Sequence, residues 1–276
     1  ATYREAVGAG SVMAGGAIAE VVESKAPGFV PGDLAFADTG WQDFAALPGK
    51  RLVKVPRIEP MTHLLSVYGV AGLTAYFGLL RIADPKLGET VVVSAAAGSV
   101  GTLVGQIAKI KGCRVVGIAG GQQKCDWLVK KLGFDAAVDY KTGPIFKTLK
   151  EAAPKGIDVY FDNVGGDILE ACLFQMNTGG RVSCCGAISA YDGAAPPAGP
   201  RGVPGLIVVK RLTLKGFIVT DFFAERDKAI ADLQAWVAAG KLKVEEDVIE
   251  GLENTPRALI GLLAGDNRGK RMVRVA

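Results

Sequence analysis

The sequence predicts an α/β protein with a doubly wound parallel sheet, preceded by a smaller β unit. Its 276 residues are enough for about two domains at roughly 150 residues per domain. From residue 90 onward, short apolar runs typical of strands alternate with helical segments, which is the pattern of βαβ units. Residues 1–58 instead carry short strand-like runs separated by turns, which is typical of an all-β unit.

The β unit contains three strand-like runs. They are AIAEVV at 17–22, LAFA at 34–37 and RLVKV at 51–55. Pro27-Gly28 and Pro31-Gly32 lie between the first two runs, where proline fixes φ and glycine tolerates the positive φ of tight turns.

The alternating region follows. We expect strands at 90–95, 113–118, 136–139, 157–162, 180–185 and 212–219. We expect helices at 99–111, 122–132, 144–153, 167–177 and 225–239, and a short β/α/β tail to residue 276. Residues 187–205 are rich in Pro, Gly and Ala and predict a long loop, and long loops are usually functional.

Charge and hydropathy exclude two classes of protein. With 32 basic and 28 acidic residues the formal net charge is +4, and no Lys/Arg run exceeds two residues, so we expect no nucleic-acid partner. Residues 60–80 and 90–108 lack charged side chains, but polar residues and glycines interrupt them, so we expect no membrane span. No apolar signal segment opens the chain, which begins without Met and is expected to be trimmed or a fragment.

The single histidine and the five cysteines exclude further chemistry. A zinc site needs three or four Cys, His or carboxylate ligands at suitable spacing, and no C-x-x-C occurs, so we expect no metal. A hydrolase triad would need His63, which lies in an apolar stretch and is better explained as structural. An odd number of cysteines favours reduced thiols and a cytoplasmic location.

A glycine-rich turn follows the strand at 90–95. The segment Ala97-Gly98-Ser99-Val100-Gly101 opens a helix, although Ala96 replaces the first glycine of the strict G-x-G-x-x-G pattern. In a dinucleotide-binding fold, Gly98 lets the backbone approach the pyrophosphate and Gly101 lets the helix pack closely on the strand. We therefore predict dinucleotide binding of the Rossmann type, with plain turn chemistry as the alternative.

The end of the second strand indicates which dinucleotide is bound. NAD sites place Asp or Glu about 20 residues after the glycines, where the carboxylate binds the ribose 2′-hydroxyl. Here the position is Gly120, and Lys124 follows shortly after it. An ammonium in place of a carboxylate attracts a 2′-phosphate, so we favour NADP(H) over NAD. The alternative is that Lys124 is a solvated helix lysine.

Several motifs together resemble one protein family. The run VVVSAAAGSVGTLVGQIAKIKGCRVVGIAGGQQK at 91–124 resembles the medium-chain dehydrogenase/reductase superfamily. More closely, it is similar to the zinc-free branch of prostaglandin/leukotriene reductases, plant double-bond reductases and curcumin reductase-like enzymes. Further matches are GLTAYFGLL at 72–80, LGFDAAVDYKT at 132–142, FDNVGG at 161–166, GRVSCCGAISAY at 180–191 and GDNRGK at 265–270. The family's upstream segment with a D-P-Y-M-R-type motif does not occur in this sequence.

The resemblance implies a domain arrangement. An incomplete GroES-like β-barrel domain at 1–71 would contact substrate, a Rossmann domain at 72–238 would bind NADP(H), and residues 239–276 would return to the first domain. The active site would lie in the cleft between the two domains. A homodimer is also implied.

The resemblance further implies cofactor-binding residues. The pyrophosphate would be held by Gly98, Ser99, Val100 and Gly101, and the 2′-phosphate by Lys124. The nicotinamide would pass Cys185, Gly186, Ala187, Ile188 and Ser189, and its carboxamide would bind the backbone of Phe217, Ile218 and Val219. The remaining contacts would come from Tyr140, Asn163 and Asn267. The alternatives are that Tyr140 is a half-buried strand-end residue and that the two asparagines only form turns.

The chemistry implied is reduction of a C=C bond conjugated to a carbonyl. Hydride from NADPH would reach the β-carbon and negative charge would move to the carbonyl oxygen. The protein would supply hydrogen-bond donors near that oxygen and a proton source for the α-carbon. Tyr191 matches a family tyrosine in the long loop and is the expected oxyanion donor or proton relay, with an exposed loop residue as the alternative. Tyr76 is better explained by core packing, and Cys184 and Cys185 have no paired base.

The sequence therefore predicts an NADPH-dependent 2-alkenal/enone reductase that acts on small molecules. A quinone reductase with the same fold and cofactor is the alternative among enzymes. A weakly catalytic NADPH-binding protein is the alternative from another class.

Overall fold

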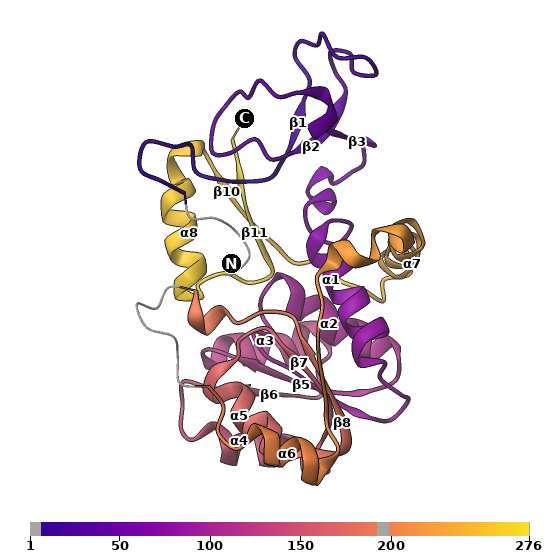
Figure 1. Ribbon diagram of the computed structural model, residues 1–276, viewed down its shortest axis with the longest axis vertical. Coiled ribbons are helices and arrows are strands. Elements are labelled where there is room, and N and C mark those ends of the chain that lie inside the picture. Colours follow the sequence, from indigo (N-terminus) through magenta and orange to yellow (C-terminus); the bar gives the residue numbers. More distant parts are fainter. Residues whose placement is uncertain (1–6, 192–198, 276) are drawn as a thin grey trace.

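The computed structural model describes residues 7–191 and 199–275, and its chain forms an upper and a lower part (Figure 1). The upper part contains the antiparallel strands β1 (Ala17–Glu20), β2 (Leu34–Ala37) and β3 (Val53–Val55), paired in the order β1-β2-β3. The strand-like runs of the first 58 residues are thereby confirmed, with two of them shortened at an end.

The C-terminal segment joins this upper part (Figure 1). Strand β10 (Glu246–Glu250), helix α8 (Thr255–Ala264) and strand β11 (Lys270–Arg274) form the expected β/α/β tail, and the two strands pair in parallel. The upper part thus contains two small sheets.

The lower part is built on a six-stranded parallel sheet. Its strands are β4 (Thr90–Val93), β5 (Arg114–Ala119), β6 (Ala136–Asp139), β7 (Ile157–Asp162), β8 (Met176–Cys184) and β9 (Thr213–Gly216). Their order is β6-β5-β4-β7-β8-β9, so the winding direction reverses between β4 and β7. This is the predicted doubly wound sheet, and ligands of such sheets bind beyond the carboxyl ends at the point of reversal.

Helices cover both faces of the sheet and create two cores. One core packs α1 (Val70–Phe77), α2 (Ser99–Ile110), α3 (Gln122–Leu132) and α7 (Arg226–Ala238) against strand residues such as Val91 and Val93. The other packs α4 (Ile145–Ala152), α5 (Gly166–Gln175) and α6 (Val203–Lys210) against residues such as Val92. Alternate residues of one strand therefore enter opposite cores, because side chains of a strand alternate in direction.

Two helices differ from the expected elements. Helix α1 and the π-helical turn Gly78–Ala83 occupy a stretch without a polar face, and six of the eight α1 residues are buried. Such a helix lacks the amphipathic period by which helices are found in a sequence. Helix α6 starts at Val203, so the loop expected to run to residue 205 ends earlier, with Pro204 in the helix's first turn where proline is tolerated. Part of that loop, residues 192–198, lies outside the described residues.

None of the helices in residues 7–191 and 199–275 has the length and apolar character needed to span a bilayer.

Candidate active site

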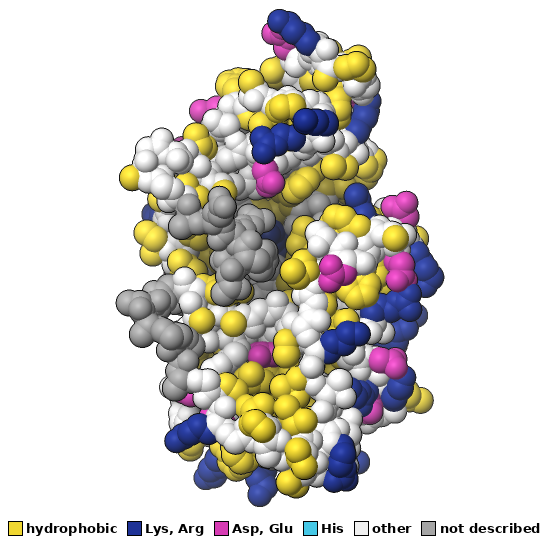
Figure 2. All heavy atoms as spheres, viewed as in Figure 1, with side chains coloured by type: hydrophobic (Ala, Val, Ile, Leu, Met, Phe, Trp, Pro, Cys, Tyr) yellow, Lys and Arg dark blue, Asp and Glu magenta, His cyan; other side chains and the backbone are white. Residues whose placement is uncertain are grey.

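The carboxyl ends of the six parallel strands meet at one edge of the sheet. The expected cofactor-binding residues follow these ends strand by strand: Gly98 to Gly101 after β4, Lys124 after β5, Tyr140 after β6, Asn163 after β7, Cys185 to Ser189 after β8, and Phe217 to Val219 after β9. The surface drawn in Figure 2 is hollowed between the upper and lower parts. The fold therefore gathers residues that are up to about 120 positions apart in the sequence.

The glycine-rich turn closes tightly onto the end of β4. Ala95 adopts a left-handed φ of 46°, and the Gly98 N–H donates to its carbonyl at 2.9 Å. A Cβ on Gly101 would lie 2.4 Å from the Ala95 oxygen and 2.7 Å from the Ala96 Cα. No side chain caps α2 at Gly98, so the first N–H groups of the helix are available to an anion. These residues fit a pyrophosphate.

A basic cluster lies beyond β5, where an NAD site would carry an acid. Gly121 has a φ of 95°, and its N–H donates to the Asp139 carboxylate at 2.8 Å. A Cβ on Gly120 would lie 2.9 Å from the Lys141 side chain and 3.1 Å from the Tyr140 ring. Because Gly120 has no side chain, Tyr140 and Lys141, which follow β6, can occupy the space beside it.

Lys124 belongs to this cluster. Its ammonium donates to the Gly265 carbonyl. Burial lowers the pKa of Lys124, and the neighbouring cations Lys141 and Arg268 lower it further. Sequence reasoning missed Lys141 and Arg268, although both lie inside matched motifs, directly after Tyr140 and Asn267. These residues fit a 2′-phosphate.

Asp162, at the end of β7, organises the edge of the sheet. One of its carboxylate oxygens accepts hydrogen bonds from the Tyr160 hydroxyl at 2.8 Å, the Ser94 hydroxyl at 3.3 Å, the Val164 N–H at 3.0 Å and the Gly165 N–H at 2.9 Å. Asp162 is 3% exposed. Burial raises the pKa of Tyr160 well above its ordinary value, so its hydroxyl keeps its proton and donates. Sequence reasoning missed Asp162, because nothing local marks its carboxylate as an acceptor for residues before and after it.

Asn163 joins the ends of β7 and β4. Its side-chain amide donates to the Ser94 carbonyl at 2.8 Å, and its backbone N–H donates to the Ser94 hydroxyl at 2.9 Å. The structure therefore gives Asn163 a turn-forming role at the carboxyl edge. Any contact of Asn163 with a cofactor remains a prediction.

The segment after β8 lies against the turn after β7. Cys185 and Gly186 donate their N–H groups to the Asp162 carbonyl at 2.8 and 3.1 Å. The Ser189 hydroxyl donates to the Val164 carbonyl at 2.6 Å. Burial raises the pKa of Cys184 to about 11 and that of Cys185 to about 12, so both thiols stay protonated at neutral pH and neither is an activated nucleophile.

Tyr191 closes the short helical turn Ile188–Ala190 and is 42% exposed. Its hydroxyl oxygen accepts a long hydrogen bond, 3.4 Å, from the Ala187 N–H. That contact places the phenol over the segment expected to pass the nicotinamide, with its proton free to be donated elsewhere.

Phe217 fixes the backbone after β9. Its ring packs edge-on against Phe161 and Phe222, with centroids 6.5 and 6.4 Å away. A Cβ on Gly78 would lie 2.4 Å from the Phe217 ring, so the glycine makes room for it. The aromatic cluster thereby anchors residues 217–219 beside the end of β8.

Asn267 lies beside the glycine-rich turn and is 7% exposed. Its amide donates to the Gly269 carbonyl at 2.8 Å, and the Gly269 N–H donates to the Ala97 carbonyl at 2.8 Å. The observed bond is internal to the turn, as the alternative expects, and any contact of Asn267 with a cofactor stays a prediction.

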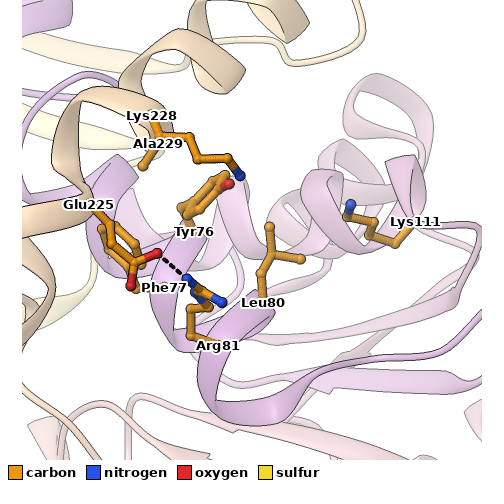
Figure 3. Close-up of a pocket in the computed structure, with 8 residues that line it drawn as sticks. All are labelled: Tyr76, Phe77, Leu80, Arg81, Lys111, Glu225, Lys228 and Ala229. Carbon is orange, nitrogen blue, oxygen red and sulfur yellow. Dashed lines mark hydrogen bonds and ion pairs between the residues drawn. The ribbon is translucent and has the colours of Figure 1, made fainter.

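Tyr76 lies away from this edge. It lines a small hollow of about 190 Å³ with Lys111, Arg81 and Glu225 (Figure 3). Lys111 directly follows α2, whose 12 residues place it roughly 18 Å from the glycine-rich turn. The Tyr76 hydroxyl donates to Asp232 at 2.6 Å, and burial followed by that bond raises its pKa to about 12. Tyr76 is a packing residue, as expected.

The described residues offer no group of three or more His, Cys, Asp or Glu side chains that could hold a metal ion. All five cysteines are free thiols, and three of them, Cys113, Cys125 and Cys172, are buried. The side chains present therefore do not fit a catalytic zinc, which needs three protein ligands.

Comparison with known proteins gives the following similarities. A family model described as zinc-binding dehydrogenase matches residues 99–235, and one described as the N-terminal domain of oxidoreductase matches residues 1–55. The chain is 49% identical to prostaglandin reductase 1 of Bos taurus over 271 residues, which cover 96% of this chain and 82% of that protein. It is 41% identical to 2-alkenal reductase (NADP(+)-dependent) of Nicotiana tabacum, over 100% of this chain and 80% of that protein.

A solved structure is also similar. CurA from Vibrio vulnificus in complex with NADPH superposes with a TM-score of 0.94 at 41% identity, covering 99% of this chain and 83% of that one. The zinc named by the first family model has no matching ligand set among the described residues.

Proposed function

Because this chain belongs to the branch of the medium-chain dehydrogenase/reductase superfamily that contains prostaglandin reductase 1 and 2-alkenal reductase, we propose that it reduces the C=C bond of α,β-unsaturated aldehydes and ketones with NADPH. The observation that carries the proposal is the carboxyl edge of the sheet. It presents a glycine turn that fits a phosphate, a basic cluster where an NAD site has an acid, and a tyrosine hydroxyl over the segment that follows β8.

The residues of this edge would hold the cofactor. The N-terminus of α2 would bind the pyrophosphate, and Lys124 would bind the 2′-phosphate. The segments 185–189 and 217–219 would flank the nicotinamide, with Tyr140, Asn163 and Asn267 nearby. NADPH, when bound, supplies a hydride. The α-carbon then takes up a proton, from the Tyr191 hydroxyl or from water, to complete the reduction, and the chain would supply positioning and charge stabilisation.

Tyr191 would stabilise the charge that develops on the substrate. Reduction of the β-carbon of an enone moves negative charge to the carbonyl oxygen, and a hydrogen-bond donor aimed at that oxygen lowers the barrier. The Tyr191 hydroxyl uses its oxygen to accept from Ala187, so its proton can be donated to substrate. No metal is required for this step.

A substrate panel tests the proposed activity. NADPH oxidation is followed with enals, enones and quinones, and then repeated with NADH. We expect turnover of enals and enones with NADPH and much slower turnover with NADH. Turnover of quinones alone would favour the alternative quinone reductase, and tight NADPH binding without any turnover would favour a cofactor-binding protein.

Metal removal gives an independent prediction. Activity is expected to survive prolonged treatment with EDTA or phenanthroline, because the described residues offer no zinc ligand set. Elemental analysis of the purified protein checks the same point. One tightly bound zinc per chain would contradict it.

A homodimer is part of the proposal. Strand β9 lies at the edge of the six-stranded sheet, where its backbone groups have one free side. The preceding Val208 and Val209 are 73% and 68% exposed, and hydrophobic side chains gather at the lower end of the face over α5 and α6 (Figure 2). Pairing of β9 with its copy about a two-fold axis would extend the sheet and cover this surface, which light scattering can test.

The division at 1–71, 72–238 and 239–276 is retained as the proposed domain arrangement. A reducing, cytoplasmic location is proposed from the five free thiols.

A further inference from the structure

Arg268 extends from the turn 265–269 over helix α3. Its guanidinium lies 6.0 Å from the centroid of the Trp127 ring, and one N–H donates to the Gln123 side-chain oxygen at 3.3 Å. Both partners belong to the helix that carries Lys124. Contact with an aromatic face and a neutral oxygen orients a guanidinium but leaves its charge uncompensated.

The turn that carries Arg268 is fixed on two sides. Gly269 forms a parallel bridge with Gly98 of the glycine-rich turn. On the other side, the Lys124 ammonium donates to the Gly265 carbonyl. Arg268 therefore starts from a defined backbone position between the expected pyrophosphate site and α3.

Lys124 has two neighbouring cations, Lys141 and Arg268, and the Lys141 side chain lies beside Gly120. Burial lowers the pKa of Lys124 most, the nearby charges of Lys141, Arg268 and, least, Arg271 lower it further, and Asp266 opposes them. None of Lys124, Lys141 and Arg268 forms an ion pair with another described residue. Like charges held together without a counterion repel each other, so an anion bound among them is stabilised by all three.

We propose that Arg268 binds the 2′-phosphate of the cofactor together with Lys124 and Lys141, so that the C-terminal segment takes part in selecting NADPH over NADH. The inference rests on the proposed use of NADPH. An arginine forms paired, charge-assisted hydrogen bonds to phosphate, which a solvated lysine cannot match. NADH lacks the phosphate and would leave the repulsion among the cations in place.

Adenosine 2′,5′-bisphosphate and 5′-AMP are the probes, because they differ by the 2′-phosphate and need no turnover. Their affinities are measured by calorimetry at low and high salt for the wild type, Arg268→Ala, Lys141→Ala and Lys124→Ala. Lys130→Ala is the matched control. This variant removes one positive charge from α3, the helix that carries Lys124, at a solvent-exposed ion pair with Asp126.

We expect Arg268→Ala to lower the affinity for adenosine 2′,5′-bisphosphate by about tenfold to a hundredfold and to make that affinity less dependent on salt. The affinity for 5′-AMP is expected to stay nearly unchanged. The Lys130→Ala control is expected to change neither affinity. Equal losses for both probes, or no loss for either, would overturn the assignment of Arg268 to the 2′-phosphate. Because neither probe is reduced, this result stays readable even if no enal or enone is turned over.

Discussion

Replacing Tyr191 by phenylalanine is expected to lower kcat on the best enone by roughly 10- to 1000-fold, the usual range for loss of an oxyanion donor. The substitution keeps the ring and deletes only the hydroxyl that lies over the Ala187 N–H. NADPH affinity is expected to stay nearly unchanged, because the donor acts on charge that develops during the reaction. Steady-state kinetics and a cofactor titration on the same preparation separate the two effects.

Tyr76→Phe is the matched control for this experiment. It also deletes one tyrosine hydroxyl, but at a site whose partner is Asp232 in the packing around α7. It is expected to leave kcat unchanged. A Tyr191→Phe protein with the wild-type kcat would show that Tyr191 is only a loop residue, and that the donor must be sought elsewhere.

Asp162→Ala is expected to cost about 3–5 kcal/mol of unfolding free energy, because it leaves several buried donors without an acceptor. Tyr160 and Ser94 are both fully buried, and their hydroxyls lose the carboxylate on which they converge. The turn after β7 loses two further bonds from its N–H groups. Urea unfolding followed by circular dichroism measures the loss.

Two further variants give this prediction its controls. Asp126→Ala removes an exposed carboxylate that also accepts two side-chain hydrogen bonds, and its urea midpoint is expected to stay close to the wild type. Asp162→Asn keeps one acceptor oxygen and is expected to recover much of the stability. If Asp162→Ala unfolds at the wild-type urea concentration, the carboxylate is not the organising group of the edge.

Local patterns of the sequence determined the sheet and the order of its elements. Strand β4 is apolar throughout and α2 follows a glycine turn, so both are recognisable from neighbouring residues alone. The resemblance to a known family supplied the expected cofactor residues, and most of them follow the carboxyl ends of parallel strands, which share one edge. Helix α1 could not be found in this way, because a helix that is buried on nearly all sides lacks the alternation of polar and apolar residues by which helices are recognised.

The tertiary structure alone decided which distant groups share one space. Arg268 and Lys124 are 144 positions apart, and only the return of the C-terminal segment to the glycine-rich turn brings their charges together. Ser94 and Asp162 meet because β4 and β7 are neighbours in the sheet although β5 and β6 lie between them in the chain. Electrostatic and hydrogen-bond partners depend on distance in space, and local periodicity carries no information about contacts made across a crossover connection.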